Sequence, residues 1–195
     1  MNTENLNALK DKAYKWAVAH GFHDEEKPDA YWLGLVMSEM GEAINADQKG
    51  MHADAVLFND DLAKMPFKDR FEAHIKDSVE DEIADIVIRL LDFAGMKGYT
   101  LLFDVTAQIL FDSKDALIYF KVNGLPGMLF FLMDFLTNGF DCDEQELRIC
   151  IYNIIYIFDD CFDKLTGGSD CDLWWFVKQK MRYNELRPKL NGKLY

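Results

Sequence analysis

Apolar residues recur every three or four positions along most of the chain, and the strict alternation typical of a half-buried strand is rare. A repeat of that length places the apolar side chains on one face of a helix. The pattern therefore predicts an all-α protein, a helical bundle. The predicted helices cover residues 3–20, 28–48, 67–97, 100–121, 125–138, 143–165 and 171–186.

Proline and glycine mark the expected ends of these helices. Pro28 suits a first helical turn, where the N–H that proline lacks would have no partner. Glycine tolerates the left-handed backbone that ends many helices. It occupies the expected ends at Gly21, Gly50, Gly98, Gly139, Gly167 and Gly168. The stretch from Gly50 to Pro66 is the least regular, and we predict a loop with short helical turns that can act as a lid.

The chain has 195 residues, of which 50% are apolar and 28% are charged. This length and composition predict a single domain over residues 1–195. The apolar runs GMLFFLMDFL and CIYNIIYIF are interrupted by Asp134, Asn153 and Asp159 before they reach the roughly 20 residues that cross a bilayer. The N-terminal MNTENLNALKDK has no apolar segment behind a basic start, so no secretory signal is expected. We expect a cytoplasmic protein with no membrane partner.

The 34 acidic and 21 basic residues give a formal net charge of −13. This excess argues against nucleic acid as the main partner, because a phosphate backbone has to be neutralised by lysine and arginine. A small phosphorylated ligand remains compatible when carboxylates hold a divalent cation that reverses the local field. The acidic excess therefore directs attention to a metal site.

Two predicted helices each carry a pair of carboxylates three residues apart. Glu39 and Glu42 lie beside the apolar stripe of YWLGLVMSEMGEAINADQ, and Glu82 and Asp85 flank the stripe of DSVEDEIADIVIRLLDFAG. The spacing puts both members of a pair on one helix face. Two such faces meeting across a bundle would offer four oxygen ligands suited to Mg²⁺ or Mn²⁺, whereas either pair alone fits solvated surface charge. Arg89, one turn beyond Asp85, can orient a carboxylate or meet a phosphate.

Other metal centres fit the residues less well. A di-iron carboxylate bundle needs a glutamate three residues before a histidine, and no histidine of the chain has one. The cysteines form no CxxC pair and no histidine follows residue 74, so we expect free thiols in place of a zinc site. These cysteines are Cys142, Cys150, Cys161 and Cys171.

The C-terminal segment VKQKMRYNELRPKLNGKLY is basic in an otherwise acidic chain. Lys180, Asn184 and Arg187 fall on one helical face, and Pro188 ends the helix. The two cations can bind outer phosphates, and the amide can hydrogen-bond a phosphate, sugar or base edge. A solvated tail that complements the helix dipole is the alternative.

The order of the three segments resembles the all-α NTP pyrophosphohydrolases of the MazG-like superfamily, which are related to the dimeric dUTPases. The resemblance rests on the ExxE pair, on the ExxD pair within EDEIADIVIRLLDFAG, and on the terminal KMRYNELRPKLNGKLY. It covers residues 28–48, 77–98 and 176–195. It implies that the four carboxylates bind Mg²⁺ and that Lys180, Asn184 and Arg187 contact the substrate.

The activity that follows is hydrolysis of a (d)NTP to a (d)NMP and pyrophosphate, as in house-cleaning of the nucleotide pool. Glu39 is the preferred acceptor for the proton of the attacking water. Trp32 and Leu35 continue the carboxylate face and are candidates for the base pocket, with core packing as the alternative. Two other functions stay open, a dUTPase-like enzyme restricted to one base and a non-catalytic helical interaction or regulatory protein.

Extra apolar helices separate the ExxD segment from the basic terminus. Residues 82–105 and 147–177 share an aliphatic helix, an aspartate, a glycine break and a second apolar segment. The second copy has Tyr152 and Asn153 in place of carboxylates, so only the first could hold a metal. The extra helices could form a degenerate second half and make the monomer pseudo-dimeric, where compact members of the family use another subunit. A homodimer and a chance likeness between amphipathic hairpins are the alternatives.

Overall fold

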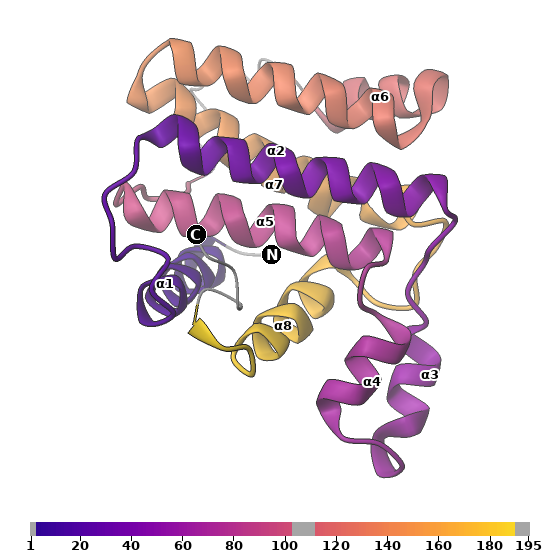
Figure 1. Ribbon diagram of the computed structural model, residues 1–195. Helices are drawn as coiled ribbons and strands as arrows, with labels where there is room; N and C mark the ends of the chain where they lie inside the picture. Colours follow the sequence, from indigo (N-terminus) through magenta and orange to yellow (C-terminus); the bar gives the residue numbers. More distant parts are fainter. Residues whose placement is uncertain (1–2, 103–111, 190–195) are drawn as a thin grey trace.

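The computed structural model describes residues 3–102 and 112–189, and every regular element in these ranges is a helix (Figure 1). The all-α prediction is therefore confirmed. The elements are α1 (Thr3–Ala19), α2 (Asp29–Gln48), α3 (Ala55–Asp60), the 3-10 turn η1 (Asp61–Ala63), α4 (Phe67–His74), α5 (Val79–Met96), α6 (Ser113–Asp141), α7 (Glu144–Leu165) and α8 (Leu173–Asn184).

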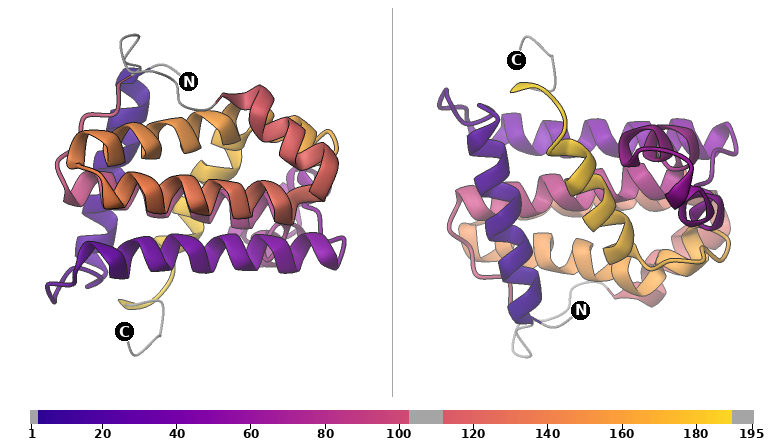
Figure 2. Two further views of the ribbon diagram at one scale, coloured as in Figure 1. Left: turned by 90° about the horizontal axis from the view of Figure 1, so that it is seen from above. Right: turned by 90° about the horizontal axis from the view of Figure 1, so that it is seen from below.

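Helix α5 is the centre of the molecule. Its apolar stripe, which includes Ile83, Ile86, Val87 and Leu90, is completely buried. Helices α1, α2, α7 and α8 all pack against it. Figure 2 shows α1 and α8 crossing α5 on the side seen from below, while α2 runs alongside it. The polar positions of α5 consequently face the space between α1, α2 and α8.

The single helix predicted over residues 67–97 is wrong, because the chain breaks between α4 and α5. Asp77 adopts a left-handed backbone with φ of 63°. Ser78 then begins α5 as its N-cap, and its Oγ accepts a hydrogen bond from the backbone N–H of Asp81 at 3.2 Å. The apolar repeat continues through this break, so periodicity alone did not reveal it.

The prediction for residues 50–66 is confirmed as a loop with short helical turns, α3 and η1. Arg70 Nη1 of α4 donates to the carbonyl oxygen of Phe58 of α3 at 2.6 Å. Glu80 ties the preceding loop to α5, because its Oε2 accepts from the backbone N–H of Ala53 at 2.9 Å. The segment is thus fixed to the N-terminal end of α5, and a lid function stays a prediction.

Helix α6 forms a hairpin with α7 and includes the helix predicted over 125–138. Its path breaks at Gly124, whose φ of 67° is left-handed. Gly139 does not end the helix as predicted but lies inside it, where a Cβ would come within 2.5 Å of Cys150 Sγ. The helix predicted over 100–121 is absent at residues 100–102 and is confirmed from Ser113 on, within α6, whereas its part at 103–111 lies outside the described residues. Whether residues 82–105 and 147–177 are repeats therefore stays a prediction.

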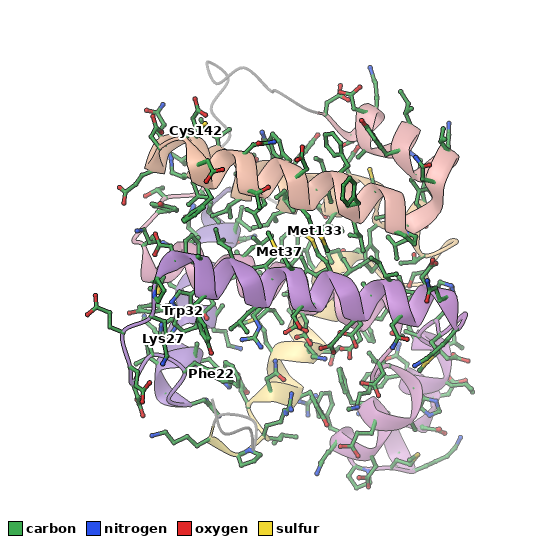
Figure 3. The ribbon with its side chains drawn as sticks, turned by 45° about the horizontal axis from the view of Figure 1, so that its top comes forward. Phe22, Lys27, Trp32, Met37, Met133 and Cys142 are labelled. Carbon is green, nitrogen blue, oxygen red and sulfur yellow. The ribbon has the colours of Figure 1, made fainter. Side chains whose placement is uncertain are left out.

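Length and composition alone would allow α6 to cross a membrane, and 28% of its most apolar window is buried. Buried core helices of soluble proteins can be equally long and apolar. In the structure α6 packs on α7 and α2. Met37 of α2 and Met133 of α6 lie between α2 and α6 (Figure 3). The apolar side chains of α6 are thus shared between the core and the molecular surface.

Candidate active site

Three of the predicted metal ligands meet in one cavity. Glu39 and Glu42 come from α2 and Glu82 from the first turn of α5, and one ligand atom of each lies within 4.8 Å of the others. The cavity has a volume of about 230 Å³ and lies between α1, α2, α5 and α8. The structure thus brings the two acidic helix faces together, as their spacing predicts.

The fourth predicted ligand, Asp85, lines the same cavity but is paired with Lys180. Lys180 Nζ lies 2.8 Å from Asp85 Oδ2 and 2.7 Å from Asp81 Oδ2. The lysine is 5% exposed. Its ammonium group therefore pairs with two carboxylates of α5 in this structure and offsets part of their charge, which differs from the free cation expected on the terminal helix. Asp81, which the sequence analysis did not single out, completes this contact.

The carboxylates repel one another and are poorly solvated. Burial, reinforced by Asp85, raises the pKa of Glu82 to about 8. Burial raises the pKa of Asp81 to about 6 even though Lys180 opposes the change. Burial and Asp85 also raise the pKa of Glu39. Glu82 Oε2 is buried and has no hydrogen-bond partner among the described residues. A hard divalent cation would satisfy this oxygen and offset the repulsion, so the donor set fits Mg²⁺ or Mn²⁺.

Arg89 holds one of the three converging carboxylates in place. Its Nε donates to Glu39 Oε1 at 3.0 Å, and its guanidinium carbon lies 5.6 Å from the centre of the Phe22 ring. The sequence predicts that Arg89 orients a carboxylate or contacts a phosphate, and this hydrogen bond to Glu39 corresponds to the first role. A contact with phosphate stays a prediction.

The C-terminal residues also reach the cavity. Asn184 and Arg187 line it together with Lys180, in agreement with their predicted common face. Asn184 is 5% exposed, and its Oδ1 has no hydrogen-bond partner among the described residues. This wall of the cavity therefore holds an unused buried acceptor and a cationic side chain.

The sequence analysis missed several residues of the wall. Lys76 and Asp77 enter from the break between α4 and α5, which the continuous apolar repeat concealed. Tyr183 of α8 also lines the cavity, and its Oη donates to Glu72 Oε1 of α4 at 2.8 Å. A serine followed by acidic residues at 78–82 was the one signal that could have located the break.

Trp32 does not line the cavity, and its assignment to the base pocket is not supported. It is 5% exposed in the core near the first turn of α2, and its ring stacks on His23 with 4.4 Å between centroids (Figure 3). Leu35 is also packed against the core. Core packing, the alternative considered for both residues, describes their positions. Trp16 of α1 lines the cavity instead.

The cavity continues along α5 to a second polar pair. Asp92 lies ten residues beyond Glu82, about 15 Å along the helix at 1.5 Å per residue. Its Oδ1 lies 2.9 Å from His23 Nε2. Burial raises the pKa of Asp92, while His23 and Arg89 act in the opposite direction. One end of the cavity is thus rich in carboxylates, and the other combines Asp92 with side chains of α1.

No protein-family model, curated protein or solved structure matches this chain. The interpretation of the site therefore rests on its own chemistry. An acidic cluster that fits a divalent cation lies in one cavity with an arginine and a buried amide from α8. Binding of a metal ion and of a phosphorylated ligand in this cavity stays a prediction.

Proposed function

We propose that this protein is a Mg²⁺-dependent nucleoside triphosphate pyrophosphohydrolase, similar to the MazG-like all-α enzymes, and that Mn²⁺ can replace Mg²⁺. The observation that supports the proposal most directly is the convergence of Glu39, Glu42 and Glu82 within 4.8 Å. Oxygen ligands of this kind suit a cation that also binds phosphates. The substrate class is a (d)NTP, and the products are a (d)NMP and pyrophosphate.

The three converging glutamates would hold the ion, with Asp85 as the fourth candidate beside them. Bound Mg²⁺ neutralises phosphate charge and increases the acidity of water. Glu39 would accept the proton of the attacking water, and Arg89, which donates to its Oε1, orients its carboxylate. Lys180 stays with Asp81 and Asp85 and limits the repulsion within the cluster.

The remaining residues would position the triphosphate. Arg187 would contact the β- and γ-phosphates, and Asn184 would hydrogen-bond the substrate from the same wall. The water oxygen forms a bond to the α-phosphorus, and the bond from that phosphorus to the α–β bridging oxygen breaks. Pyrophosphate is then the leaving group, and the proton of the water passes to Glu39.

The test is to identify products by phosphorus NMR after incubation with nucleoside triphosphates and Mg²⁺, without added pyrophosphatase. We expect the monophosphate and pyrophosphate to appear together. Glu42→Gln should abolish turnover, whereas Glu26→Gln, an exposed glutamate outside the cavity, should retain it. A nucleoside diphosphate and orthophosphate as primary products would contradict the proposed reaction.

The contribution of the α8 wall can be tested separately. Replacing Arg187 by methionine should lower kcat/KM about 100-fold, because a cation facing the phosphates stabilises the developing charge. Lys164→Met removes the same charge from an exposed site on α7 and serves as the matched control. Equal activity of the two variants would identify Arg187 as part of a solvated tail.

A further inference from the structure

The end of the cavity away from the acidic cluster is a narrow space between α1 and α5. Ala13 and Ala17 lie one turn apart on α1 and are 1% and 3% exposed. Together with Trp16 they face Ile88 and Asp92 of α5 across the cavity. Alanine side chains are small, so two of them on consecutive turns leave room for a ligand. The surrounding aliphatic and aromatic groups favour binding of a ligand with a flat, largely apolar ring.

This space lies at a suitable separation from the acidic cluster. Asp92 follows Asp85 by seven residues, which corresponds to about 10 Å along α5. A nucleotide whose phosphates lie at the glutamates can therefore extend along α5 and bring its base to Asp92. The continuity of the cavity from Glu82 to Asp92 allows this path.

Asp92 is held in one orientation as a hydrogen-bond acceptor. His23 Nε2 contacts its Oδ1 at 2.9 Å, and the histidine ring is packed between Trp32, with 4.4 Å between centroids, and Tyr14, with 5.0 Å. Burial raises the pKa of Asp92, and His23 and Arg89 oppose this rise by favouring the ionised carboxylate. The second oxygen, Oδ2, makes no hydrogen bond to a described residue, although Asp92 lines the cavity. A rigid acceptor is thus available to a ligand.

We propose that this space binds the nucleobase and that Asp92 selects bases with an exocyclic amino group, above all cytosine over uracil. The inference rests on the proposed function, because it assumes a nucleotide with its phosphates at the glutamates. A carboxylate accepts hydrogen bonds and an amino group donates them. Uracil and thymine present a carbonyl oxygen at the corresponding position, and a carboxylate repels it. The inference therefore disfavours an enzyme restricted to dUTP.

The test compares cytosine with uracil, which differ in the amino group and carbonyl at one edge. The affinities of the α,β-imido analogues of dCTP and dUTP, which are not cleaved at that bond, are measured by calorimetry in Mg²⁺. We expect the wild-type protein to bind the dCTP analogue roughly tenfold more tightly or better. In Asp92→Asn, the ratio should fall to near one, because an amide offers both a donor and an acceptor.

Asp163→Asn, an exposed aspartate of α7 outside the cavity, is the matched control and should keep the wild-type ratio. The wild-type ratio decides the inference even if Asp92→Asn does not fold. Equal affinities, or a preference for the uracil analogue, would overturn it.

The proposed function is judged separately, by the products formed from dCTP. Cytosine selectivity without hydrolysis would support the base site and contradict the enzyme. Hydrolysis to monophosphate and pyrophosphate without base selectivity would support the enzyme and contradict the base site. Failure of both analogues to bind would overturn the base site, whereas the products alone decide the proposed function.

Discussion

Lys180 offsets acidic charge in the cavity and, by the same ion pair, engages a candidate metal ligand. It is buried against Asp81 and Asp85 at 2.7 and 2.8 Å, so it neutralises part of the acidic cluster. Burial disfavours its charge, yet Asp85 and Asp81 raise its pKa well above the ordinary value. The same pairing engages Asp85, a carboxylate that a metal ion would also use.

Substitution of Lys180 by methionine should destabilise the metal-free protein by about 3–5 kcal/mol, because it leaves the buried Asp81 and the partly buried Asp85 without a counter-charge. Urea unfolding in a chelator measures this change. Lys178→Met, an exposed lysine on the same helix, should have little effect and is the control. Mg²⁺ should recover part of the lost stability if it binds beside Asp85. A similar stability for both variants would contradict the importance of the buried pair.

Glu82 should make the metal-free protein less stable as the pH rises. Its pKa is about 8 in the folded protein, against 4.5 for an unperturbed glutamate, so the folded state retains the proton more strongly. The stabilisation is fully present below pH 4.5 and is lost as the pH rises through about 8. Asp81 acts in the same direction up to about pH 6, and Glu82 continues to act up to about pH 8.

Thermal unfolding in a chelator between pH 6 and 8 tests this expectation. The midpoint of wild-type unfolding should fall over this interval, and Glu82→Gln should reduce the fall, because glutamine does not titrate. Glu26→Gln, an exposed control, should leave the slope unchanged. The assignment would fail if the Glu82 variant kept the wild-type slope.

At the scale of elements, the first turn of α5 links helix capping to the site. Ser78 Oγ accepts from the backbone N–H of Asp81, and Glu82 follows within the same turn. The backbone N–H of Asp77 donates to Asp81 Oδ2 at 3.1 Å. These bonds fix the first turn of α5, on which Glu82 lies, and one of them holds the Asp81 side chain directly.

Ser78→Ala should cost about 1 kcal/mol of stability and also weaken Mg²⁺ binding, because the freed turn no longer holds Glu82 in position. Asp143→Ala removes the N-cap of α7, which accepts from the backbone N–H of Glu146 at 2.9 Å. It should have a similar effect on stability and none on Mg²⁺ affinity. Chemical denaturation and metal calorimetry on both variants separate the two effects. Equal Mg²⁺ affinities would contradict the link.

For the whole molecule, a formal net charge of −13 and a cluster of three glutamates, two of them buried, should make stability depend on divalent cations. A ligand that binds only the folded state stabilises it by about 2.7 kcal/mol at a free concentration of 100 times Kd. Saturating Mg²⁺ should therefore raise the unfolding midpoint of the wild type clearly above that in matched ionic strength of NaCl. Glu39→Gln combined with Glu42→Gln should remove this difference. Equal midpoints in Mg²⁺ and NaCl would contradict a site in the cavity.

The sequence alone determined the helical class and the faces of the main helices. The apolar stripe of α2 contains Leu33, Val36 and Met40, which are buried, and Met37 and Ile44, which are half-buried. In the stripe of α5, Ile83 and Leu90 are buried. These features depend on a periodicity of three to four residues, which is local and visible in the chain. The convergence of the ExxE and ExxD pairs follows from packing the two stripes together, since each pair lies beside its stripe.

Tertiary structure decided which side chains share the cavity, how they are paired and how their pKa values are shifted. The apolar periodicity does not distinguish Trp16, which lines the cavity, from Trp32, which stacks on His23, because both lie on helices that pack against the core. Lys180 and Asp81 are 99 residues apart, and their pairing depends on how α8 crosses α5. The raised pKa of Glu82 likewise results from burial by several elements. Helix periodicity defines a face, whereas its partners and its solvation arise only when distant helices pack together.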